Sequence, residues 1–407
     1  MKARIWLCGV AVVVIAAGCS GAGTPLPKTG VPAVSGASGA SPSSGAAATV
    51  APSAAATSAA LPSMTPGTFM EIGAVAGCYP DPVAALAGDG KLIVTGCGEF
   101  HNTWQFDPAT GKASEIDANT EVSTRAVTLR DGRVFVLFEQ DGGALVVDSK
   151  AGKAGAEIDS PGSEDSPAIG YNDATLLLND GRVLIAGGDS GSQNLVGYAY
   201  ANLFDPATGK ISRTGSMTIV RSDFTAVKLA DGRVLVAGGE TGSDLNSVTS
   251  KAEIFDPATG KFTATGSLRK ARYSAGGTLL PGGKVLIVGG TDADENSLSS
   301  AELFDPRTGK FSLTGSMAKA RGNHEDWAPL AVPLPDGRVV VMGGEDDDLN
   351  FVSTVEIYDP ATGKFKSDGA IGGSVYYLTG AFLQADGTLL VVGGGETGAP
   401  TVWRYQP

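Results

Sequence analysis

The sequence predicts an all-β fold, a seven-bladed β-propeller of four-stranded antiparallel blades. Three observations predict it. A heptapeptide of the form FDPATGK recurs at intervals of roughly 50 residues. A two-residue hairpin turn, Asp-Gly in six copies and Gly-Gly in one, recurs seven times, and the first apolar segment after the N-terminal region resembles the fourth strand of each repeat. Such a period is typical of repeat proteins in which each unit is one supersecondary module.

The heptapeptide is the most regular feature of the chain. Five copies are well preserved and begin with an aromatic residue: Phe106–Lys112, Phe204–Lys210, Phe255–Lys261, Phe304–Lys310 and Tyr358–Lys364. A weaker copy spans Val147–Lys153, and a seventh begins at Tyr405, just before the end of the sequence. In the five well-preserved copies, proline fixes φ early in the turn and glycine supplies a positive φ before the next strand, so each of them predicts a tight turn between two strands.

One repeat, residues 222–269, shows the expected unit. The segments Phe224–Leu229 and Arg233–Gly239 flank the hairpin turn Asp231-Gly232. The second segment is β-branched without polar alternation, which indicates a strand buried on both faces. After a variable loop come Ala252–Phe255, the heptapeptide turn and a fourth strand. Four short antiparallel strands in a repeat of this length are typical of a propeller blade.

The seven hairpin turns give the number of blades. They are Asp89-Gly90, Asp131-Gly132, Asp180-Gly181, Asp231-Gly232, Gly282-Gly283, Asp336-Gly337 and Asp386-Gly387. The last repeat ends after its third strand, whereas Gly67–Gly73 resembles the fourth strand Gly260–Gly266. We therefore expect the N-terminal strand to complete the last blade and close the ring, which leaves no sheet edge open.

The N-terminal residues are predicted to be a targeting segment. Lys2 and Arg4 precede the short apolar run Ile5–Ala17, and Ala-Ala-Gly leads to Cys19. This pattern resembles the bacterial lipobox, which implies a lipoprotein signal peptide over residues 1–18 and a lipid anchor on Cys19. Cleavage nearby without lipidation is the alternative. Ser20 follows the cysteine, and by resemblance to the lipoprotein sorting rule this does not favour retention at an inner membrane.

Residues 19–66 are rich in Ala, Ser, Gly and Pro and nearly free of charge, so we expect a disordered tether. Residues 67–407 form the propeller. The chain carries 30 Lys and Arg against 43 Asp and Glu, a net charge of −13, which argues against nucleic acid as a partner. We expect an exported monomer, held at the cell membrane or outer envelope by its acyl chain.

Paired glycines after an apolar strand, followed by the aromatic-Asp-Pro turn, resemble Kelch repeats. The pairs are Gly187-Gly188, Gly238-Gly239, Gly289-Gly290, Gly343-Gly344 and Gly393-Gly394. The resemblance covers the whole predicted propeller and implies its fold. Two features depart from the pattern: the tryptophan after the turn is replaced, for example by Phe262, and the second repeat has Phe138-Glu139 in place of the glycine pair.

Blade six carries the largest departure from the repeat. Five residues are inserted within Arg321, Gly322, Asn323, His324, Glu325, Asp326 and Trp327, on the variable-loop side of the ring. A histidine, two carboxylates and a tryptophan at the mouth of the channel suit a sugar, a peptide or a metal. The alternative is a surface loop that only satisfies its own hydrogen bonds. We treat Arg321, Asn323, His324, Glu325, Asp326 and Trp327 as candidate ligand-binding residues.

Arg221, Arg272 and Arg321 occupy equivalent positions in three consecutive blades. They are candidates for a cationic arc around an anionic ligand, but bridging of adjacent blades is the favoured role. The acidic loops Asp292–Asn296 and Glu345–Asp348 are interpreted as solvated, although clustered carboxylates also suit calcium. Cys78 and Cys97 belong to the same face of blade one, so export favours a disulfide between them.

Among enzymes, galactose oxidase is similar in fold, and its copper centre uses two His, two Tyr and a Cys joined to one Tyr. This chain has only His101 and His324, without an evident Tyr–Cys motif. Sialate epimerases share the fold as well. We therefore expect no catalytic residue, metal or cofactor, and a non-catalytic module that binds protein or glycan through its variable loops. The alternative is an epimerase- or oxidase-like carbohydrate enzyme with its site near His324.

Overall fold

The computed structural model describes residues 64–75, 82–97, 102–119, 123–138, 143–159, 173–189, 197–241, 247–322, 328–373, 375–394 and 399–407. These segments contain strands and no helix. Accordingly, the described part of the chain has no helix of the length and apolar character needed to cross a membrane. The predicted signal peptide, Cys19 and nearly all of the predicted tether lie outside the described residues.

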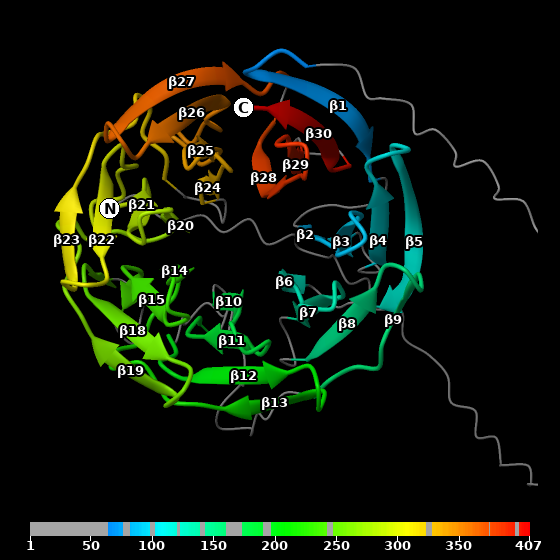
Figure 1. The fold of residues 1–407 in the computed structure, drawn as a ribbon, viewed down its shortest axis with the longest axis horizontal. Coiled ribbons are helices and arrows are strands. Elements are labelled where there is room, and N and C mark those ends of the chain that lie inside the picture. The colour runs from blue at the N-terminus through cyan, green and yellow to red at the C-terminus, as the bar shows by residue number, and fades with distance from the viewer. Residues whose placement is uncertain are drawn as a thin grey trace, which may run out of the picture. The chain divides into compact units, whose positions relative to one another are not determined.

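The strands form seven four-stranded antiparallel sheets, as the repeat predicted (Figure 1). Blade one holds β2 (Val83–Leu86), β3 (Leu92–Cys97), β4 (Asn102–Asp107) and β5 (Lys112–Asn119). Blade two holds β6 (Ser123–Thr128), β7 (Val134–Phe138), β8 (Ala144–Asp148) and β9 (Lys153–Ala154). Blade three holds β10 (Ala174–Leu177), β11 (Val183–Ala186), β12 (Ala201–Asp205) and β13 (Lys210–Arg213).

The later blades repeat this order from the inner to the outer strand. Blade four holds β14 (Thr225–Lys228), β15 (Val234–Ala237), β18 (Ala252–Asp256) and β19 (Lys261–Ala264). Blade five holds β20 (Gly276–Leu279), β21 (Val285–Val288), β22 (Ala301–Asp305) and β23 (Lys310–Leu313). Blade six holds β24 (Leu330–Pro333), β25 (Val339–Met342), β26 (Thr354–Asp359) and β27 (Lys364–Ala370). Between β15 and β18, β16 (Glu240–Thr241) and β17 (Ser247–Val248) form a small hairpin.

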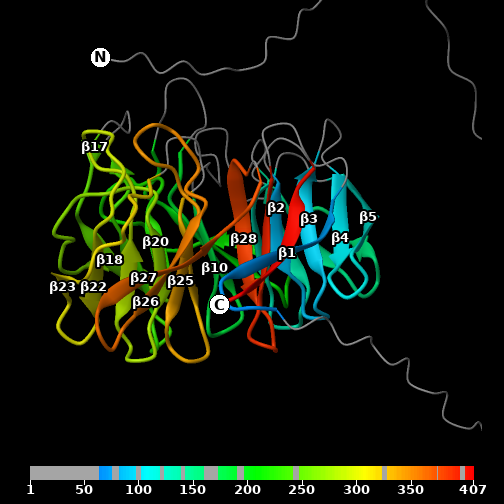
Figure 2. The ribbon, with the colours of Figure 1, turned by 90° about the horizontal axis from the view of Figure 1, so that it is seen from above.

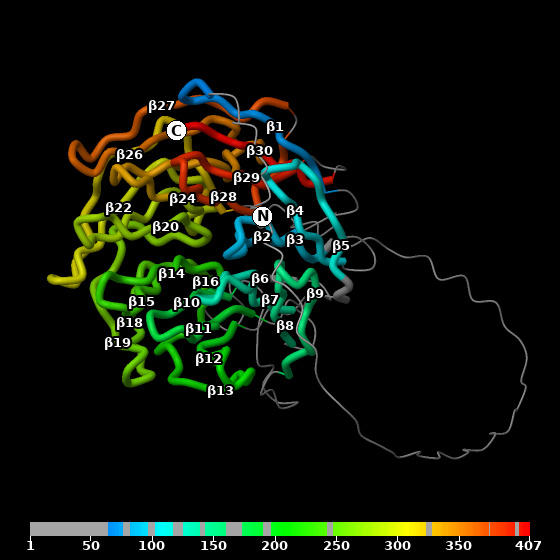
Figure 3. The backbone as a smooth tube through the Cα atoms, turned by 45° about the vertical axis from the view of Figure 1, so that its right-hand side comes forward, coloured from blue at the N-terminus to red at the C-terminus, as the bar shows by residue number. Residues whose placement is uncertain are grey.

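Blade seven joins the two ends of the propeller. It holds β28 (Tyr377–Leu383), β29 (Leu389–Gly394), β30 (Thr401–Gln406) and, as its outer strand, β1 (Thr68–Ala74). Thr68 lies opposite Gln406, and the Phe69 and Tyr405 rings stack with centroids 4.5 Å apart. Figure 3 shows β1 running beside β30. The predicted closure by the N-terminal strand is confirmed.

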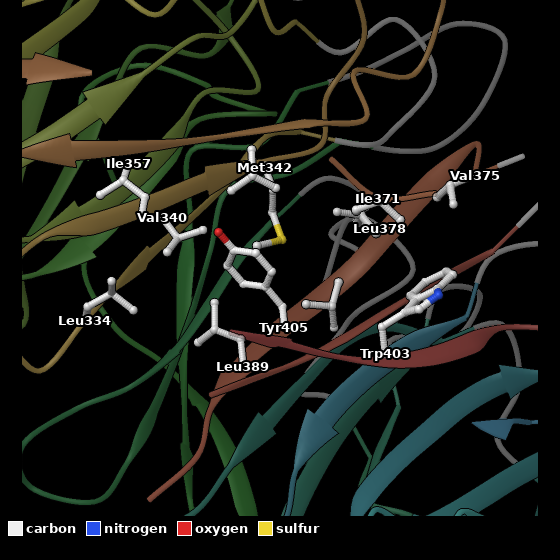
Figure 4. Packing of buried hydrophobic residues seen from close by; sticks show 12 residues of the cluster. Leu334, Val340, Met342, Ile357, Ile371, Val375, Leu378, Leu389, Trp403 and Tyr405 are labelled. Carbon is white, nitrogen blue, oxygen red and sulfur yellow. The ribbon is translucent and has the colours of Figure 1, made fainter. Parts of the chain in front are cut away.

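The hydrophobic core is divided among the junctions between blades. Each of the seven buried clusters takes its side chains from two neighbouring blades, and together the clusters complete the circle. In the cluster between blades six and seven, Met342 and Val340 pack near Tyr405 and Leu389 (Figure 4). Middle strands such as β15 are buried along their whole length, as predicted. Face-to-face burial between blades therefore holds the ring together.

The paired glycines have a clear structural reason. Gly238 and Gly239 have φ of 72° and 96°, in the left-handed region that favours glycine. A Cβ on Gly238 would lie 2.3 Å from the carbonyl oxygen of Arg272, and the Gly239 amide donates to this same oxygen at 2.8 Å. The segment that leads into blade five thus docks directly on the glycine pair of blade four.

Candidate functional site

The ring has two different faces, because strands alternate in direction within each blade. The turn face carries the Asp-Gly and Asp-Pro turns. The loop face carries the connections from second to third strands and from one blade to the next. The hairpin β16–β17 rises at the upper edge of the ring in Figure 2, which places the loop face at the top of that view.

The turn face is repetitive, and four of its hairpin turns each hold an internal ion pair. In four blades the turn reads Asp-Gly-Arg, and the arginine pairs with the aspartate two residues before it: Arg133 with Asp131, Arg182 with Asp180, Arg233 with Asp231 and Arg338 with Asp336, at 2.6–2.7 Å. The hydrogen bond from Arg133 lowers the pKa of the Asp131 carboxyl below its usual value. These turns are scaffold elements.

The loop face carries the exposed apolar side chains. Among the described residues, three large apolar side chains are exposed: Leu313 (64%), Leu349 (56%) and Tyr376 (46%). Leu349 lies in the loop between β25 and β26, and Tyr376 precedes β28. Leu313 ends β23, an outer strand that runs from the turn face toward the loop face. Leu349 also has a φ of 61°, which is unusual for leucine.

The three equivalent arginines lie at the junctions between blades, and their side chains are buried. Arg272 donates from Nη1 to the Gly289 and Ser300 carbonyl oxygens at 2.7 and 3.0 Å, and from Nη2 to Glu302 Oε1 at 3.0 Å. Its own carbonyl accepts the Gly239 amide of the preceding blade. Each arginine therefore connects two blades, which is the bridging role that the sequence favoured.

The same contacts recur at the two neighbouring junctions. Arg221 pairs with Glu253 at 3.2 Å and Arg321 with Glu356 at 3.3 Å, and in each pair both side chains are at most 3% exposed. Burial lowers the pKa of each arginine from its usual value, while the glutamate partner raises it. The guanidinium groups point into protein rather than into the mouth of the channel, so the structure does not bring them together as an arc.

Several predicted site residues lie outside the described part of the chain. Asn323, His324, Glu325, Asp326 and Trp327 do so, as do His101 and Cys78. Cys97 ends β3, on the loop-face side of blade one. The candidate site in blade six and the candidate disulfide therefore stay predictions.

The two acidic loops adopt the same conformation. Asp292 Oδ1 accepts the Asp294 and Asn296 amides, and Asp346 Oδ1 accepts those of Asp348 and Asn350, at 2.9–3.0 Å. Asp347 Oδ1 also accepts the Ser297 amide at 2.6 Å, which joins the loop of blade six to that of blade five. No group of three metal-ligating side chains occurs within the described segments.

Sequence reasoning missed a polar cluster between blades two and three. Asp173 is fully buried at the start of β10, and Arg125 of β6 lies 3.6 Å from its Oδ1. Burial raises the pKa of Asp173 to about 6, although the Arg125 charge lowers it. The signal was available: aligning β10 with β14 places Asp173 where blade four has Phe224. A buried charge at an apolar position of the repeat marks a departure from the scaffold.

Comparison with known proteins agrees with the fold. The Kelch motif model matches residues 272–318 and 327–367. A fungal alcohol oxidase of the AA5 family, solved in complex with copper, is 19% identical with a TM-score of 0.62 over 83% of this chain and 76% of its own. YjhT is 12% identical with a TM-score of 0.52 over 72% of this chain and 98% of its own. The curated proteins include no match to the sequence.

Proposed function

Because this chain is a Kelch-repeat β-propeller, we propose that it is a surface-tethered, non-catalytic module that binds protein or glycan on its loop face. One observation carries the proposal, the contrast between the two faces. The turn face consists of repeated, internally paired turns, whereas the loop face holds Leu349 and Tyr376 in place of buried or polar side chains. Function on a repeated scaffold resides where the repeat is broken.

The exposed side chains on the loop face do not help the fold. Leu349 replaces Glu295 of the equivalent loop in blade five, with the same φ of 61°. An exposed leucine in this conformation gains no burial, and the left-handed region costs it roughly 1–2 kcal/mol. Tyr376 likewise stands where blades four to six have a buried arginine. Exposed apolar and aromatic side chains of this kind are typical of binding surfaces.

Tethering at the surface is proposed from the N-terminal sequence. The small-residue motif before Cys19 and the nearly uncharged segment after it suit a lipid anchor followed by a long spacer. In the propeller, β1 is the first strand after this segment. Labelling with a radioactive or clickable fatty acid tests the anchor: label on the wild-type protein and none on Cys19→Ala supports it, and equal label on both contradicts it.

Capture from envelope extracts tests the binding proposal. A protein comprising residues 64–407 serves as bait, beside the double variant Leu349→Asp/Tyr376→Asp and the control Arg307→Ala on the turn face. Arg307 is 84% exposed in its side chain and suits this control. We expect capture by the wild type and the control and strong loss in the double variant. Loss in Arg307→Ala alone would contradict the assignment of the binding face.

An activity assay distinguishes the enzymatic alternative from the binding module. Carbohydrate oxidation or epimerisation by the purified protein, abolished by His324→Ala while capture is unchanged, would replace the binding module with an enzyme.

A further inference from the structure

Among the described residues, the junction between blades two and three shows no arginine–glutamate bridge like those at three other junctions. In blade four, Glu253 lies opposite Val236 on the neighbouring strand. In blade three, the residue equivalent to Val236 is Ile185, and Asn202 lies opposite it in place of a glutamate. The chain also has no arginine between Arg133 and Arg182, so no counterpart of Arg221 comes from this segment. The described part of this junction therefore has other residues in place of an arginine–glutamate pair.

A buried carboxylate and an arginine lie at the channel end of this junction. Thr175 donates to Asp173 Oδ2 at 2.9 Å, whereas Oδ1 has no hydrogen-bond donor within reach in the described segments. Arg125 Nε donates to the Asp173 carbonyl oxygen at 3.2 Å, and its side chain is 39% exposed. Asp173 thus holds an arginine of blade two that is open to solvent on the loop face.

An aromatic stack lies toward the rim of the same blade. The rings of Tyr198 and Tyr200 stack with centroids 4.9 Å apart and an interplanar angle of 21°. The Arg213 guanidinium carbon lies 3.9 Å from the centroid of the Tyr200 ring. Both tyrosines are half-buried and Arg213 is exposed. Burial, and then the charge of the buried Asp189, raise the pKa of Tyr198.

These residues form one row across the blade. Asp173 precedes β10, Asp189 follows β11, Tyr200 precedes β12 and Arg213 ends β13, all at the loop-face ends of consecutive strands. In Figure 1 these four strands follow one another in the order β10, β11, β12 and β13 from the channel to the rim. Strands are about 4.8 Å apart, so the row spans roughly 14 Å. We call Arg125, Asp173, Asp189, Tyr198, Tyr200 and Arg213 the blade-three row.

We propose that the blade-three row binds an oligosaccharide. This inference rests on the proposed function and adds to it the class of ligand and the position of the binding site. A sugar ring offers an apolar C–H surface and a rim of hydroxyl groups. The half-buried Tyr198 ring suits the first, and guanidinium donors such as Arg125 and Arg213 suit the second. Tyr200 lies between Tyr198 and Arg213 and therefore positions both side chains. Asp173 acts as a positioning residue for Arg125.

The chemistry of the row favours a glycan over a protein. Within the described segments, none of the exposed large apolar side chains belongs to the blade-three row. Leu349 of blade six and Tyr376 of blade seven, in contrast, are exposed. Protein partners are anchored by apolar and aromatic side chains that become fully buried. A row of charged and hydroxyl groups beside aromatic rings instead matches a ligand that is polar along its whole length.

The full-length protein, purified in detergent, is first applied to an array of neutral and acidic oligosaccharides. The glycan with the strongest signal is then titrated by calorimetry against Arg213→Gln, Tyr200→Ala and the turn-face control Arg233→Gln. We expect Arg213→Gln and Tyr200→Ala each to weaken binding at least tenfold, with the control unchanged. Arg213 is exposed, so its variant keeps the test valid if Tyr200→Ala fails to fold.

Asp173→Asn separates positioning from stability. We expect weaker glycan binding without a fall in melting temperature, because the amide keeps the shape of the side chain but not its charge. An empty array, or binding equal to wild type in both row variants, overturns the inference. If protein capture through Leu349 and Tyr376 persists in that case, the proposed function stands and only the glycan site is lost. If neither glycan binding nor protein capture is observed, both the glycan site and the proposed function are contradicted.

Discussion

At the scale of single residues, the main finding is that Arg221, Arg272 and Arg321 belong to the scaffold. Removing two charges from water is costly, and the cost is offset only where hydrogen bonds satisfy both groups. Here each guanidinium donates to backbone carbonyls and to a glutamate, and Glu302 also accepts the Arg269 amide. The arginine–glutamate bridge therefore supplies hydrogen-bond donors to backbone carbonyl groups at a junction where two blades meet without regular strand pairing.

Arg272→Ala is expected to lower the free energy of unfolding by about 3–5 kcal/mol, because it leaves Glu302 buried without its partner. Urea denaturation measures the change. The double variant Arg272→Met/Glu302→Leu is expected to cost less, since neither charge remains. Arg133→Ala, at an exposed pair, serves as the control and should cost about 1 kcal/mol or less. Equal effects of Arg272→Ala and Arg133→Ala would contradict the bridging role.

Asp173 is expected to reduce stability at neutral pH. Its folded pKa of about 6 lies above the ordinary value of 3.8, so the folded state binds more protons between these values. The contribution of Asp173 to stability is then greatest below about pH 4 and falls as pH rises through 6, by about 3 kcal/mol in all. The groups facing the carboxyl are Arg125, Thr175 and Asp189.

Asp173→Asn tests this linkage. The variant should gain up to about 3 kcal/mol of unfolding free energy at pH 7.5 and almost nothing at pH 4, since the amide mimics the protonated acid. Denaturant unfolding at the two pH values provides the measurement. A variant less stable than wild type at pH 7.5 would show that the ionised form supports the fold.

At the scale of strands and turns, the sequence predicted most of the fold. The heptapeptide, the Asp-Gly turns and the resemblance of Gly67–Gly73 to a fourth strand predicted the blades and their closure. These signals can be seen in short stretches of sequence. Turn geometry restricts which residues can adopt the required φ, and burial restricts the side chains of a strand to apolar types. The blade-three row was missed because it joins β6 to β10, and Asp173 departs from the repeat only when strand register is known.

The glycine pair offers a test at this scale. Gly238 and Gly283 both have a positive φ, of 72° and 80°. A Cβ on Gly238 meets the Arg272 carbonyl, whereas one on Gly283 meets nothing within 4 Å. Gly283→Ala should cost roughly 1–2 kcal/mol, the penalty of the left-handed region alone. Gly238→Ala should cost clearly more, as thermal unfolding can show; equal costs would mean that the docking contact is unimportant.

At the scale of the whole molecule, β1 is expected to keep the ring closed. Thr68 and Gln406 are directly opposite in the antiparallel pair, at a separation that a disulfide can span. Thr68→Cys/Gln406→Cys should form an intramolecular bond and raise stability by about 4 kcal/mol, because the closed loop is long. The pair Ser114→Cys/Gln406→Cys should stay reduced. Mobility on non-reducing gels distinguishes the two, and a reduced 68/406 pair would contradict the closure.

The proposed function requires that the ring be divided into a scaffold face and a binding face. Single cysteines at Leu349 on the loop face and Arg307 on the turn face, 56% and 84% exposed, can each carry a polyethylene glycol maleimide. Capture from envelope extract is then measured before and after labelling. We predict that polymer at position 349 blocks capture and polymer at position 307 does not. Blocking at 307 with free capture at 349 would contradict the account.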